Sequence, residues 1–568
     1  MNIKQYLSPF RMQCILAIFC KVLEAIFELI VPLLVASLID IGIRQQNSSY
    51  LIQMVIYLVV LSCFGLTFSI ICQFYASRIS QGVGTNLRNQ LFHHILSFSF
   101  DEVNQTGASS LILKMTQDIA QIQLAIAMFI RLAFRLPFLL CGALLLACIL
   151  DFTMTITIFC TMLILLLIFF ILMKLSLPFY SLIQNLSEQL SRLCAESLKG
   201  ISVIHIFAQE KPTFDHFQHT ALSLKKKEIT FATLSSLLHP CTSFFSNLCI
   251  MILLQQGAIR IEQGKLTQGN MIAFWNYMTQ ILLALLIFAQ LVVIFSKAIG
   301  SMKRIQDTFH LPVQNIPIQK PEISIQSDLN APLFTLQDVC FRYPKNSLDL
   351  FHHLNCVLPK QSKIAIVGGL GSGKSTFIHL LSQLFTSTSG DIFFQGINLK
   401  DYPLFQYKKA ISVVPQKAVL FQGTIRDNLS FRKDNPSDQE LWKALEIAQA
   451  KDFITQLPDK LDSQVTQEGK NFSGGQRQRL CIARSLVGDF DVLILDDSFS
   501  ALDNITARQL KLALTEHYPQ KSLLIISQKV QWIQDSDLIL VFHSGKIIAQ
   551  GTHKELLKYC EIYQDLCD

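Results

Sequence analysis

Six long apolar stretches in the first 300 residues limit what this chain can fold into more than any other feature. Two of them, Phe152–Met173 and Met271–Ser296, contain no charged residue. Each stretch is long enough to cross a hydrocarbon layer ~30 Å thick as a helix. The other four are Cys14–Ile41, Leu51–Cys72, Leu132–Leu150 and Leu238–Ala258. Since only 16% of the residues are charged, against about a quarter in soluble proteins, a wholly soluble enzyme is excluded.

The basic residues predict which side of the membrane each segment faces. If the N-terminus lies inside, the outside loops carry few cations, namely Arg44, Arg260 and Lys265. The inside segments carry many more: Arg78, Arg88, Lys114, Arg192, Lys199, Lys211 and Lys225 to Lys227. This bias follows the positive-inside rule. We therefore predict a multi-pass integral membrane protein with a cytoplasmic N-terminus and long helical extensions into the cytoplasm.

The composition changes near residue 310, and this change predicts the domain boundaries. Residues 1–310 are expected to form the membrane domain, with six transmembrane helices. Residues 311–332 contain four prolines and few large apolar side chains, as is typical of a linker. In residues 333–568, short β-type runs such as Lys363–Val367, Ile411–Val414, Val492–Leu495 and Leu523–Ile526 alternate with helical stretches. This alternation predicts an α/β domain with a mostly parallel sheet.

The 15 cysteines are spread along the chain without a C-x-x-C pair. Many of them lie in apolar runs, where a free thiol packs as a small hydrophobic group. We therefore expect neither a zinc site nor a disulfide framework.

A phosphate-binding loop follows the first of the predicted strands. The sequence Gly368-Gly-Leu-Gly-Ser-Gly-Lys-Ser375 satisfies G-x-x-x-x-G-K-[ST]. Its glycines allow backbone N–H groups to close on phosphates, Lys374 reaches the β- and γ-oxygens, and Ser375 offers a hydroxyl to Mg²⁺. The candidate nucleotide contacts here are Gly368, Gly369, Leu370, Gly371, Ser372, Gly373, Lys374, Ser375 and Thr376.

A second phosphate-site element is the run from Asp491 to Asp497. Its four apolar residues predict a buried strand that delivers Asp496 towards Mg²⁺. Alone, a strand that ends in two aspartates indicates only a capped loop. Combined with the preceding phosphate loop, it indicates a nucleotide site.

The segment Phe472-Ser-Gly-Gly-Gln-Arg-Gln-Arg479 lies between these two elements. Together the three closely resemble the ATP-binding cassette transporters, in which this segment is the signature motif. The resemblance implies ATP and Mg²⁺ as cofactors and extends to further positions. Tyr343 is similar to the residue that stacks on adenine, Gln416 to the Q-loop glutamine that touches Mg²⁺, and Asp503 to the end of the D-loop. The implied magnesium ligands are Ser375, Gln416 and Asp496.

Six helices fused ahead of one cassette resemble a half-transporter of the exporter branch, located in the bacterial plasma (inner) membrane. In that family two cassettes pair head to tail, and each ATP lies between one phosphate loop and the other chain's signature motif. The resemblance therefore implies a second half-transporter as partner. Its nucleotide would contact the signature residues of this chain, which are Phe472, Ser473, Gly474, Gly475 and Gln476.

Two residues depart from the family pattern at the catalytic positions. Asp497 stands where a glutamate polarises the attacking water, and Gln528 stands where a histidine contacts the γ-phosphate. The carboxylate of Asp497 ends roughly 1 Å short of the position that a glutamate carboxylate would reach, and misplacement of that size can cost ~10²-fold in rate. A neutral amide donates a hydrogen bond but cannot become a cation.

The two departures indicate a site that binds ATP and hydrolyses it slowly. They resemble the degenerate-site subunit of heterodimeric bacterial multidrug-type exporters, whose partner carries the missing glutamate and histidine. Two alternatives stay open. One is a homodimer with two slow sites, and the other is a regulatory or channel-like protein that does not pump.

The expected mechanism is alternating access driven by ATP. Segments near Ser99–Asn104 and Ile204–Lys211 are the candidate coupling helices. Glu24 and Glu28 share a face of the first helix and either attract a cationic cargo, bond to neighbouring helices or lie near the cytoplasmic boundary. Polar residues on the sixth helix either line a cavity or hydrogen-bond within the bundle: Asn276, Tyr277, Gln280 and Gln290. The sequence does not distinguish a drug, lipid, peptide or siderophore cargo.

Overall fold

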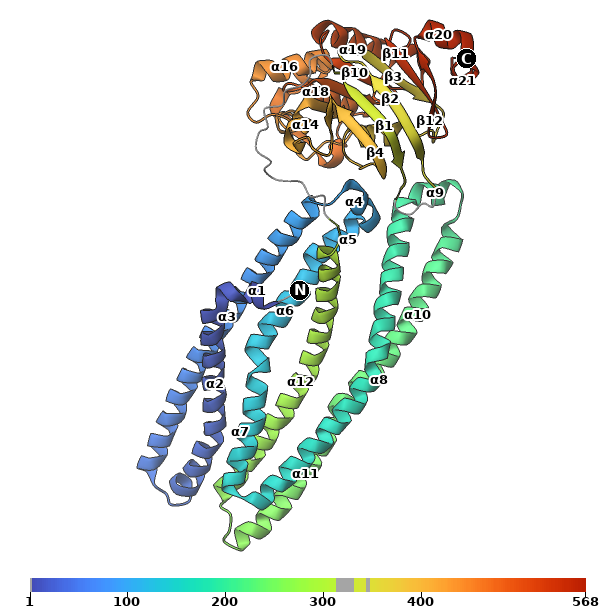
Figure 1. Cartoon of the computed structure of the whole chain (residues 1–568). Coiled ribbons are helices and arrows are strands. Elements are labelled where there is room, and N and C mark those ends of the chain that lie inside the picture. Colours follow the sequence, from blue (N-terminus) through green and yellow to red (C-terminus); the bar gives the residue numbers. More distant parts are fainter. Residues whose placement is uncertain (1–2, 313–330, 344–347, 568) are drawn as a thin grey trace. The chain divides into compact units, whose positions relative to one another are not determined.

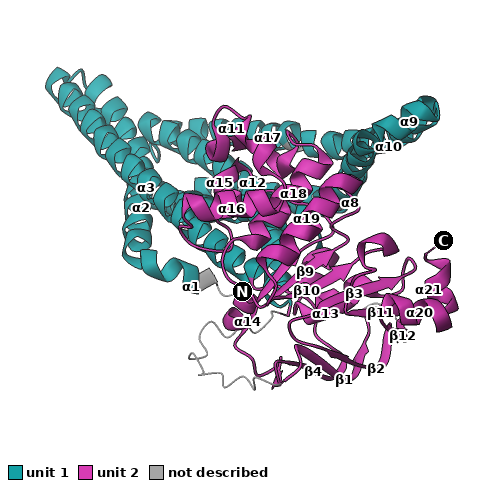
Figure 2. Cartoon of the chain, turned by 90° about the horizontal axis from the view of Figure 1, so that it is seen from above, with its two compact units in different colours: residues 1–96, 106–311 teal, residues 97–105, 312–568 magenta. Residues whose placement is uncertain are grey.

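The computed structural model describes residues 3–312, 331–343 and 348–567 (Figure 1). The chain divides into two compact units, residues 1–96 with 106–311 and residues 97–105 with 312–568 (Figure 2). The short segment 97–105 thus belongs to the second unit although it lies in the first half of the sequence. Most of the predicted linker, 311–332, lies outside the described residues.

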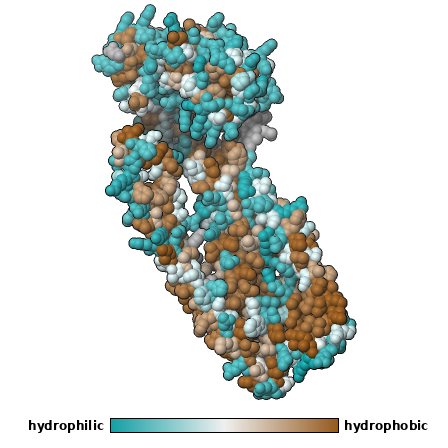
Figure 3. Space-filling view, turned by 180° about the vertical axis from the view of Figure 1, so that it is seen from behind, coloured by the Kyte–Doolittle hydropathy of each residue, from teal (hydrophilic) through white to brown (hydrophobic). Residues whose placement is uncertain are grey.

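In the described residues of the first unit, helices joined by short turns are the only regular secondary structure. Among the described residues, six helical spans are long and apolar enough to cross a membrane, as predicted: Gln5–Ile43, Ser48–Leu96, Ala108–Leu150, Phe152–Ser176, Glu210–Glu262 and Gln268–Phe309. On the face drawn in Figure 3, hydrophobic side chains gather over these helices, whereas the surface of the second unit is mostly hydrophilic. An apolar surface of this kind requires a hydrocarbon environment.

The helices of the first unit have the following bounds. They are α1 Ile3–Leu7, α2 Arg11–Ser37, α3 Ser48–Leu96, α5 Ala108–Leu113, α6 Ile119–Met128, α7 Arg135–Leu150, α8 Phe152–Lys199, α9 Ile201–Ile206, α10 Glu210–Ser236, α11 Leu238–Glu262 and α12 Gln268–Phe309. Short π-helical turns at Leu38–Ile43 (η2), Lys114–Asp118 (η3) and Phe129–Ala133 (η4) continue α2, α5 and α6. Helix α4, Phe100–Thr106, begins in the segment that belongs to the second unit.

Buried polar contacts fix α12 against its neighbours. The carboxylate of Asp118 is buried and accepts hydrogen bonds from Ser301 Oγ at 2.9 Å and from Arg304 Nε at 3.0 Å. Asp40 Oδ1 accepts from the backbone N–H of Gly269 at 2.9 Å, which satisfies a donor at the first turn of α12. The backbones approach so closely here that a Cβ on Gly269 would lie 2.2 Å from the carbonyl oxygen of Ala36.

The second unit contains the predicted parallel sheet. Its six strands lie in the order β12-β11-β3-β10-β9-β6, and only β12 is antiparallel. Both faces of the sheet are covered, as the continuous apolar strands require. In β3, for example, Ala365 and Val367 face one core, and Ile364 and Ile366 face the other. The strands are β3 Lys363–Gly368, β6 Ile411–Val414, β9 Val492–Asp496, β10 Ser522–Ile526, β11 Leu538–His543 and β12 Lys546–Gly551.

Two further sheets were not predicted from the sequence. A four-stranded antiparallel sheet has the order β2-β1-β4-β5, and a small ribbon pairs β7 with β8. The strands are β1 Phe334–Phe341, β2 Phe351–Leu358, β4 Ser389–Phe394, β5 Ile397–Asn398, β7 Gly423–Thr424 and β8 Gln464–Val465. The helices of this unit are α13 Lys374–Leu381, α14 Leu404–Ala410, α15 Ile425–Leu429, α16 Asp438–Ile447, α17 Lys451–Thr455, α18 Gly474–Leu486, α19 Asn504–His517, α20 His553–Tyr559 and α21 Glu561–Asp565.

Replacing Gly269 with alanine is expected to destabilise the packing of α2 against α12, because the new Cβ would collide with a backbone carbonyl. The expected loss is about 1–3 kcal/mol, as for other overpacked sites. The thermal midpoint of the detergent-solubilised chain measures it. Gly65→Ala is the matched control, since nothing lies within 4 Å of a Cβ at Gly65 in α3. Equal midpoints for the two variants would show that the α2–α12 approach is not tightly constrained.

Candidate nucleotide-binding site

The predicted phosphate-binding, metal-binding and catalytic residues come from loops at one edge of the parallel sheet. Strands β3, β10, β9 and β6 are adjacent and parallel, so their carboxyl ends meet at the same edge. In the register of these strands, Ile526 is paired with Ile366 on one side and with Asp496 on the other. The phosphate loop follows β3, and Gln528, Asp497 and Gln416 come directly after the other three strands. The tertiary structure therefore brings together residues up to 160 positions apart, since Gln528 minus Gly368 is 160.

The phosphate loop has the backbone conformation that its glycines allow. Gly371 and Gly373 have φ values of 73° and 103°, in the left-handed region that other residues rarely adopt. The Lys374 ammonium donates to the carbonyl oxygens of Gly368 at 2.8 Å and Gly369 at 2.6 Å. Burial lowers the pKa of Lys374, while Asp497 and Asp496 raise it. The loop thus holds a partly buried cation at the start of α13, beside backbone N–H groups that suit an anion.

Asp496 lies at the end of β9 and is 5% exposed. Burial, and then repulsion from Asp497, raises the pKa of Asp496 to about 6, although Lys374 opposes the shift. In the described part of the chain its carboxylate makes no hydrogen bond and no ion pair. A buried carboxylate without a partner is costly, and a divalent cation would offset that cost. Asp496 therefore fits the predicted role of magnesium ligand.

Asp497 has a φ of 47°, and its backbone N–H donates to the carbonyl oxygen of Ile526 at 3.1 Å. This bond joins the end of β9 to the end of β10. Burial raises the pKa of Asp497, while Ser500, Lys374 and Lys529 lower it. Gln528 and Gln416 are exposed at the same edge of the sheet. These side chains are thus available to a nucleotide and its metal.

Tyr343, the predicted adenine-stacking residue, is anchored beside α13. Its hydroxyl group and the hydroxyl of Thr376 form a hydrogen bond of 2.7 Å. Its ring packs at a near right angle against Phe341, with centroids 5.0 Å apart, and against Phe385, with centroids 5.6 Å apart. Tyr343 therefore contacts Thr376, the residue that follows Ser375 of the phosphate loop.

The signature residues form the start of α18. Ser473 Oγ accepts from the N–H of Gln476 at 3.3 Å, and Gln476 Oε1 accepts from the N–H of Ser473 at 2.9 Å, which is a capping box. Phe472 is 6% exposed and packs in the core, so its ring supports the loop. In the described structure no hydrogen bond joins residues 472–476 to residues 368–376. Asp503, the last D-loop residue, caps α19 by accepting from Thr506 N–H at 2.9 Å.

An aromatic contact that the sequence did not predict involves the segment 97–105. The ring of Phe100, in α4, lies 5.7 Å from the ring of His379 and 5.9 Å from that of Phe385. Phe385 also contacts Tyr343, so aromatic rings connect α4 with the neighbour of the phosphate loop. About 280 residues separate Phe100 from its partners. Only its position in the predicted coupling segment Ser99–Asn104 pointed to this residue.

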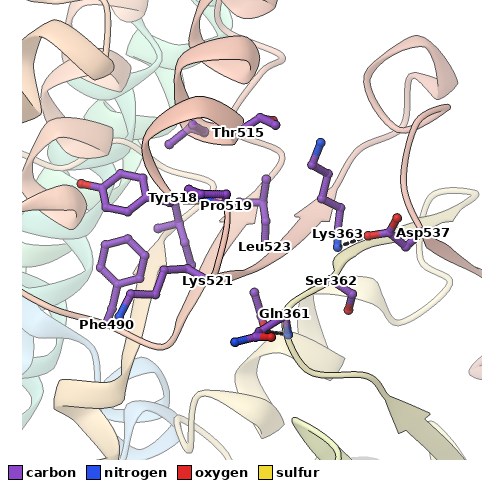
Figure 4. Close-up of a pocket in the computed structure, with 13 residues that line it drawn as sticks. Gln361, Ser362, Lys363, Phe490, Thr515, Tyr518, Pro519, Lys521, Leu523 and Asp537 are labelled. Carbon is purple, nitrogen blue, oxygen red and sulfur yellow. Dashed lines mark hydrogen bonds between the residues drawn. The ribbon is translucent and has the colours of Figure 1, made fainter.

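A separate cavity of about 170 Å³ opens at the other edge of the sheet, where β3 and β10 begin (Figure 4). Its lining includes Phe490, Tyr518 and Lys521. The backbone N–H of Lys363 donates to Asp537 Oδ2 at 2.7 Å, and the Lys521 ammonium is paired with Asp489 at 2.7 Å. The cavity therefore lies away from the phosphate loop, and one of its two lysines, Lys521, already has a carboxylate partner.

Comparison with known proteins agrees with this geometry. Residues 14–301 match the family model of the ABC transporter transmembrane region, and residues 351–500 match that of the ABC transporter. An uncharacterized ABC transporter ATP-binding protein of Bacillus subtilis, YfiB, is 31% identical over 98% of this chain and 96% of its own length. A protein of Wigglesworthia glossinidia brevipalpis named ATP-dependent lipid A-core flippase is 27% identical over 98% of this chain and 96% of its own length.

A solved structure with the same fold is that of a bacterial Atm1-family ABC exporter with ATP bound. Its TM-score to this chain is 0.82 at 21% identity, and 98% of each chain is covered. The membrane helices, the phosphate loop at the sheet edge and these matches lead to one conclusion. The chain belongs to the ABC transporter family and is an exporter-type half-transporter, whose single cassette is the ATPase of an ATP-driven translocase.

Proposed function

We propose that this chain exports a cargo across the bacterial plasma membrane by alternating access, as one half of a two-chain transporter. One observation carries the two-chain proposal. The phosphate loop and the signature motif occupy separate parts of the cassette, with no hydrogen bond between them in the described structure. A nucleotide on the loop of one chain therefore requires a second cassette to supply a signature motif, as the family resemblance implies. The cassettes and the N-terminus lie in the cytoplasm in this proposal.

The residues at the sheet edge fit ATP and Mg²⁺. The glycine-rich loop and Lys374 would hold the phosphates, and Tyr343 would stack on adenine. Magnesium, held by Ser375, Gln416 and Asp496, would neutralise charge on the β- and γ-phosphates. The buried and unpaired Asp496 carboxylate supports this assignment, since its pKa is raised by burial.

Slow hydrolysis at this site follows from the two departures. Asp497 would polarise the attacking water, but its carboxylate is one methylene shorter than that of glutamate. Gln528 would donate to the γ-phosphate without supplying positive charge. The opposite site, built on this chain's signature motif, needs only a partner with the usual glutamate and histidine. A non-identical partner is therefore our proposal, and a homodimer or a non-pumping regulator is the alternative.

The surface of α9 supports contact with a second chain. This helix ends the long polar extension formed by α8 and α10, yet large apolar side chains are exposed around it. Val203 is 58% exposed, Ile206 75% and Phe207 68%. Exposed apolar groups that cluster in a cytoplasmic segment indicate an interaction surface. We assign this surface, which overlaps the predicted coupling segment Ile204–Lys211, to the cassette of the partner chain.

The aromatic contacts of Phe100 provide a route from nucleotide to helices. Phe100 packs on Phe385, which packs on Tyr343, which is hydrogen-bonded to Thr376 next to Ser375. A nucleotide that stacks on Tyr343 would therefore shift the surface on which α4 rests. Because α3 ends at Leu96, just before this segment, movement of α4 is passed along the chain to a membrane helix.

The double substitution Asp497→Glu with Gln528→His is expected to raise steady-state ATP hydrolysis by the chain alone in lipid at least tenfold. The longer carboxylate and the ionisable imidazole supply the two groups that the site lacks. Asp491→Glu, the same change at the other end of β9, is the control and should leave hydrolysis unchanged. Brisk hydrolysis by the unmodified chain would contradict the heterodimer proposal, since Asp497 would then suffice.

Phe100→Ala is expected to uncouple the helices from the nucleotide. ATP affinity should change less than twofold, whereas the ATP-induced distance change between spin labels on α2 and α8 should fall to less than a third. Phe92→Ala is the control, because the Phe92 ring is 51% exposed and makes no described ring contact. An unchanged spin-label response in the Phe100 variant would exclude this aromatic route.

A further inference from the structure

Three helices of the membrane unit meet at a polar cluster that the ATP site does not explain. The cluster consists of Glu28 on α2, Arg135 at the start of α7 and Gln280 on α12. Arg135 Nη2 donates to Glu28 Oε2 at 2.5 Å, and Gln280 Nε2 donates to the backbone carbonyl oxygen of Glu28 at 3.3 Å. One turn of α12 away, the buried Tyr277 hydroxyl donates to the carbonyl oxygen of Leu29 at 3.1 Å. Ionisable residues in a membrane span are costly and are retained for function.

The neighbouring carboxylate, Glu24, forms an ion pair in which both of its oxygens accept a hydrogen bond. Lys21 Nζ donates to both Glu24 oxygens at 2.8 Å, and the side chains are only 6% and 16% exposed. Glu28, on the same face of α2, is different. Its Oε1 makes no hydrogen bond in the described part of the chain, and its side chain is 35% exposed. Glu24 is therefore occupied within its own helix, whereas Glu28 keeps one oxygen available.

Arg135 and Gln280, the two partners of Glu28, also have polar atoms that make no hydrogen bond in the described structure. Arg135 Nε and Gln280 Oε1 are buried, and neither has a hydrogen-bond partner among the described residues. In a membrane no water replaces the missing partner at low cost. The cluster thus offers two acceptors, Glu28 Oε1 and Gln280 Oε1, and one cationic donor, Arg135 Nε. These are the complements of an ammonium group and of a phosphate or carboxylate group.

We propose that Glu28, Arg135 and Gln280 bind the polar headgroup of a zwitterionic amphipath, with Glu28 and Gln280 accepting from its ammonium and Arg135 donating to its anionic group. The inference rests on the proposed export function and specifies its cargo class. The Glu28–Arg135 pair is neutral, so a ligand with a single charge would leave a net charge in a medium of low dielectric constant. A zwitterion satisfies both partners without net charge. Phe138, one turn from Arg135 and 45% exposed, provides apolar surface for an attached chain.

Direct binding to the nucleotide-free, full-length chain in nanodiscs tests this proposal. Three fluorescent probes share one acyl chain. The first carries phosphoethanolamine, the second carries the same headgroup with its amine acylated, and the third carries an ammonium alone. We expect the first probe to bind at least tenfold more tightly than the other two. Glu28→Gln should remove most of the preference for the ammonium-bearing headgroup, whereas Arg135→Gln should remove the preference for the phosphate.

Glu24→Gln is the matched control, because Glu24 lies on the same face of α2 but both of its oxygens are already bonded to Lys21. The affinities of this variant for the three probes should stay within twofold of those of the unmodified chain. Glu28→Asp should recover part of the preference. Gln280→Leu keeps the ion pair and should weaken the ammonium-bearing probes only, which provides a second reading if Glu28→Gln does not fold. Equal affinity for the three probes, or an equal loss of all three in every variant, would overturn the proposal.

The same samples separate this inference from the export proposal. Each is also assayed for ATP binding and for the ATP-induced distance change between spin labels on α2 and α8. If those responses are normal and the headgroup preference is missing, only the cargo inference fails. If ATP produces no distance change in the unmodified chain co-assembled with a partner, alternating access itself fails.

Discussion

The parallel alignment of four strand ends is the constraint on which the nucleotide site depends. Strands β3, β10, β9 and β6 are held in register by backbone hydrogen bonds, and their apolar side chains are buried on both faces of the sheet. A shift of one residue would turn each strand's side chains to the opposite core. The register therefore fixes where each loop begins. It places the lysine, the aspartates and the two glutamines at one edge, whatever the loops themselves prefer.

In the membrane unit many apolar side chains are exposed rather than buried, because the surroundings are lipid and not water. Its helices satisfy their own backbone groups and expose apolar side chains, so specificity between helices comes from a few polar contacts. Asp40 with Gly269, Asp118 with Arg304, and Glu28 with Arg135 are three of these. The first two join helices directly, because Asp118 accepts from two side chains of α12 and Asp40 accepts from the first turn of α12. The third leaves polar atoms without partners in the described structure, which is why we propose it as a ligand site and not only as a contact between helices.

The scaffold and the chemistry of the cassette are separable. Asp497 and Gln528 occupy positions fixed by β9 and β10, and the bond from Asp497 N–H to Ile526 involves only backbone atoms. If these residues have the proposed catalytic roles, we expect exchanging their side chains to alter catalysis without altering the fold. The same logic applies to Phe100, whose ring occupies a surface formed by Phe385 and His379. In the proposed function, a half-transporter with slow hydrolysis at one site therefore keeps the contacts that we assign to coupling between the nucleotide and the helices.

The sequence alone determined what depends on local pattern: six spans from apolar length, four strands of the parallel sheet from short β-branched runs, and the phosphate loop and signature motif from spacing within a few residues. Pairings between distant segments were decided only by the tertiary structure. The sheet formed by β2, β1, β4 and β5 joins strands on both sides of the phosphate loop. Phe100 meets partners about 280 residues away, and Glu24 and Glu28, alike in sequence, differ because only Glu28 faces Arg135 of another helix. Such contacts depend on how whole elements pack, and no local preference encodes them.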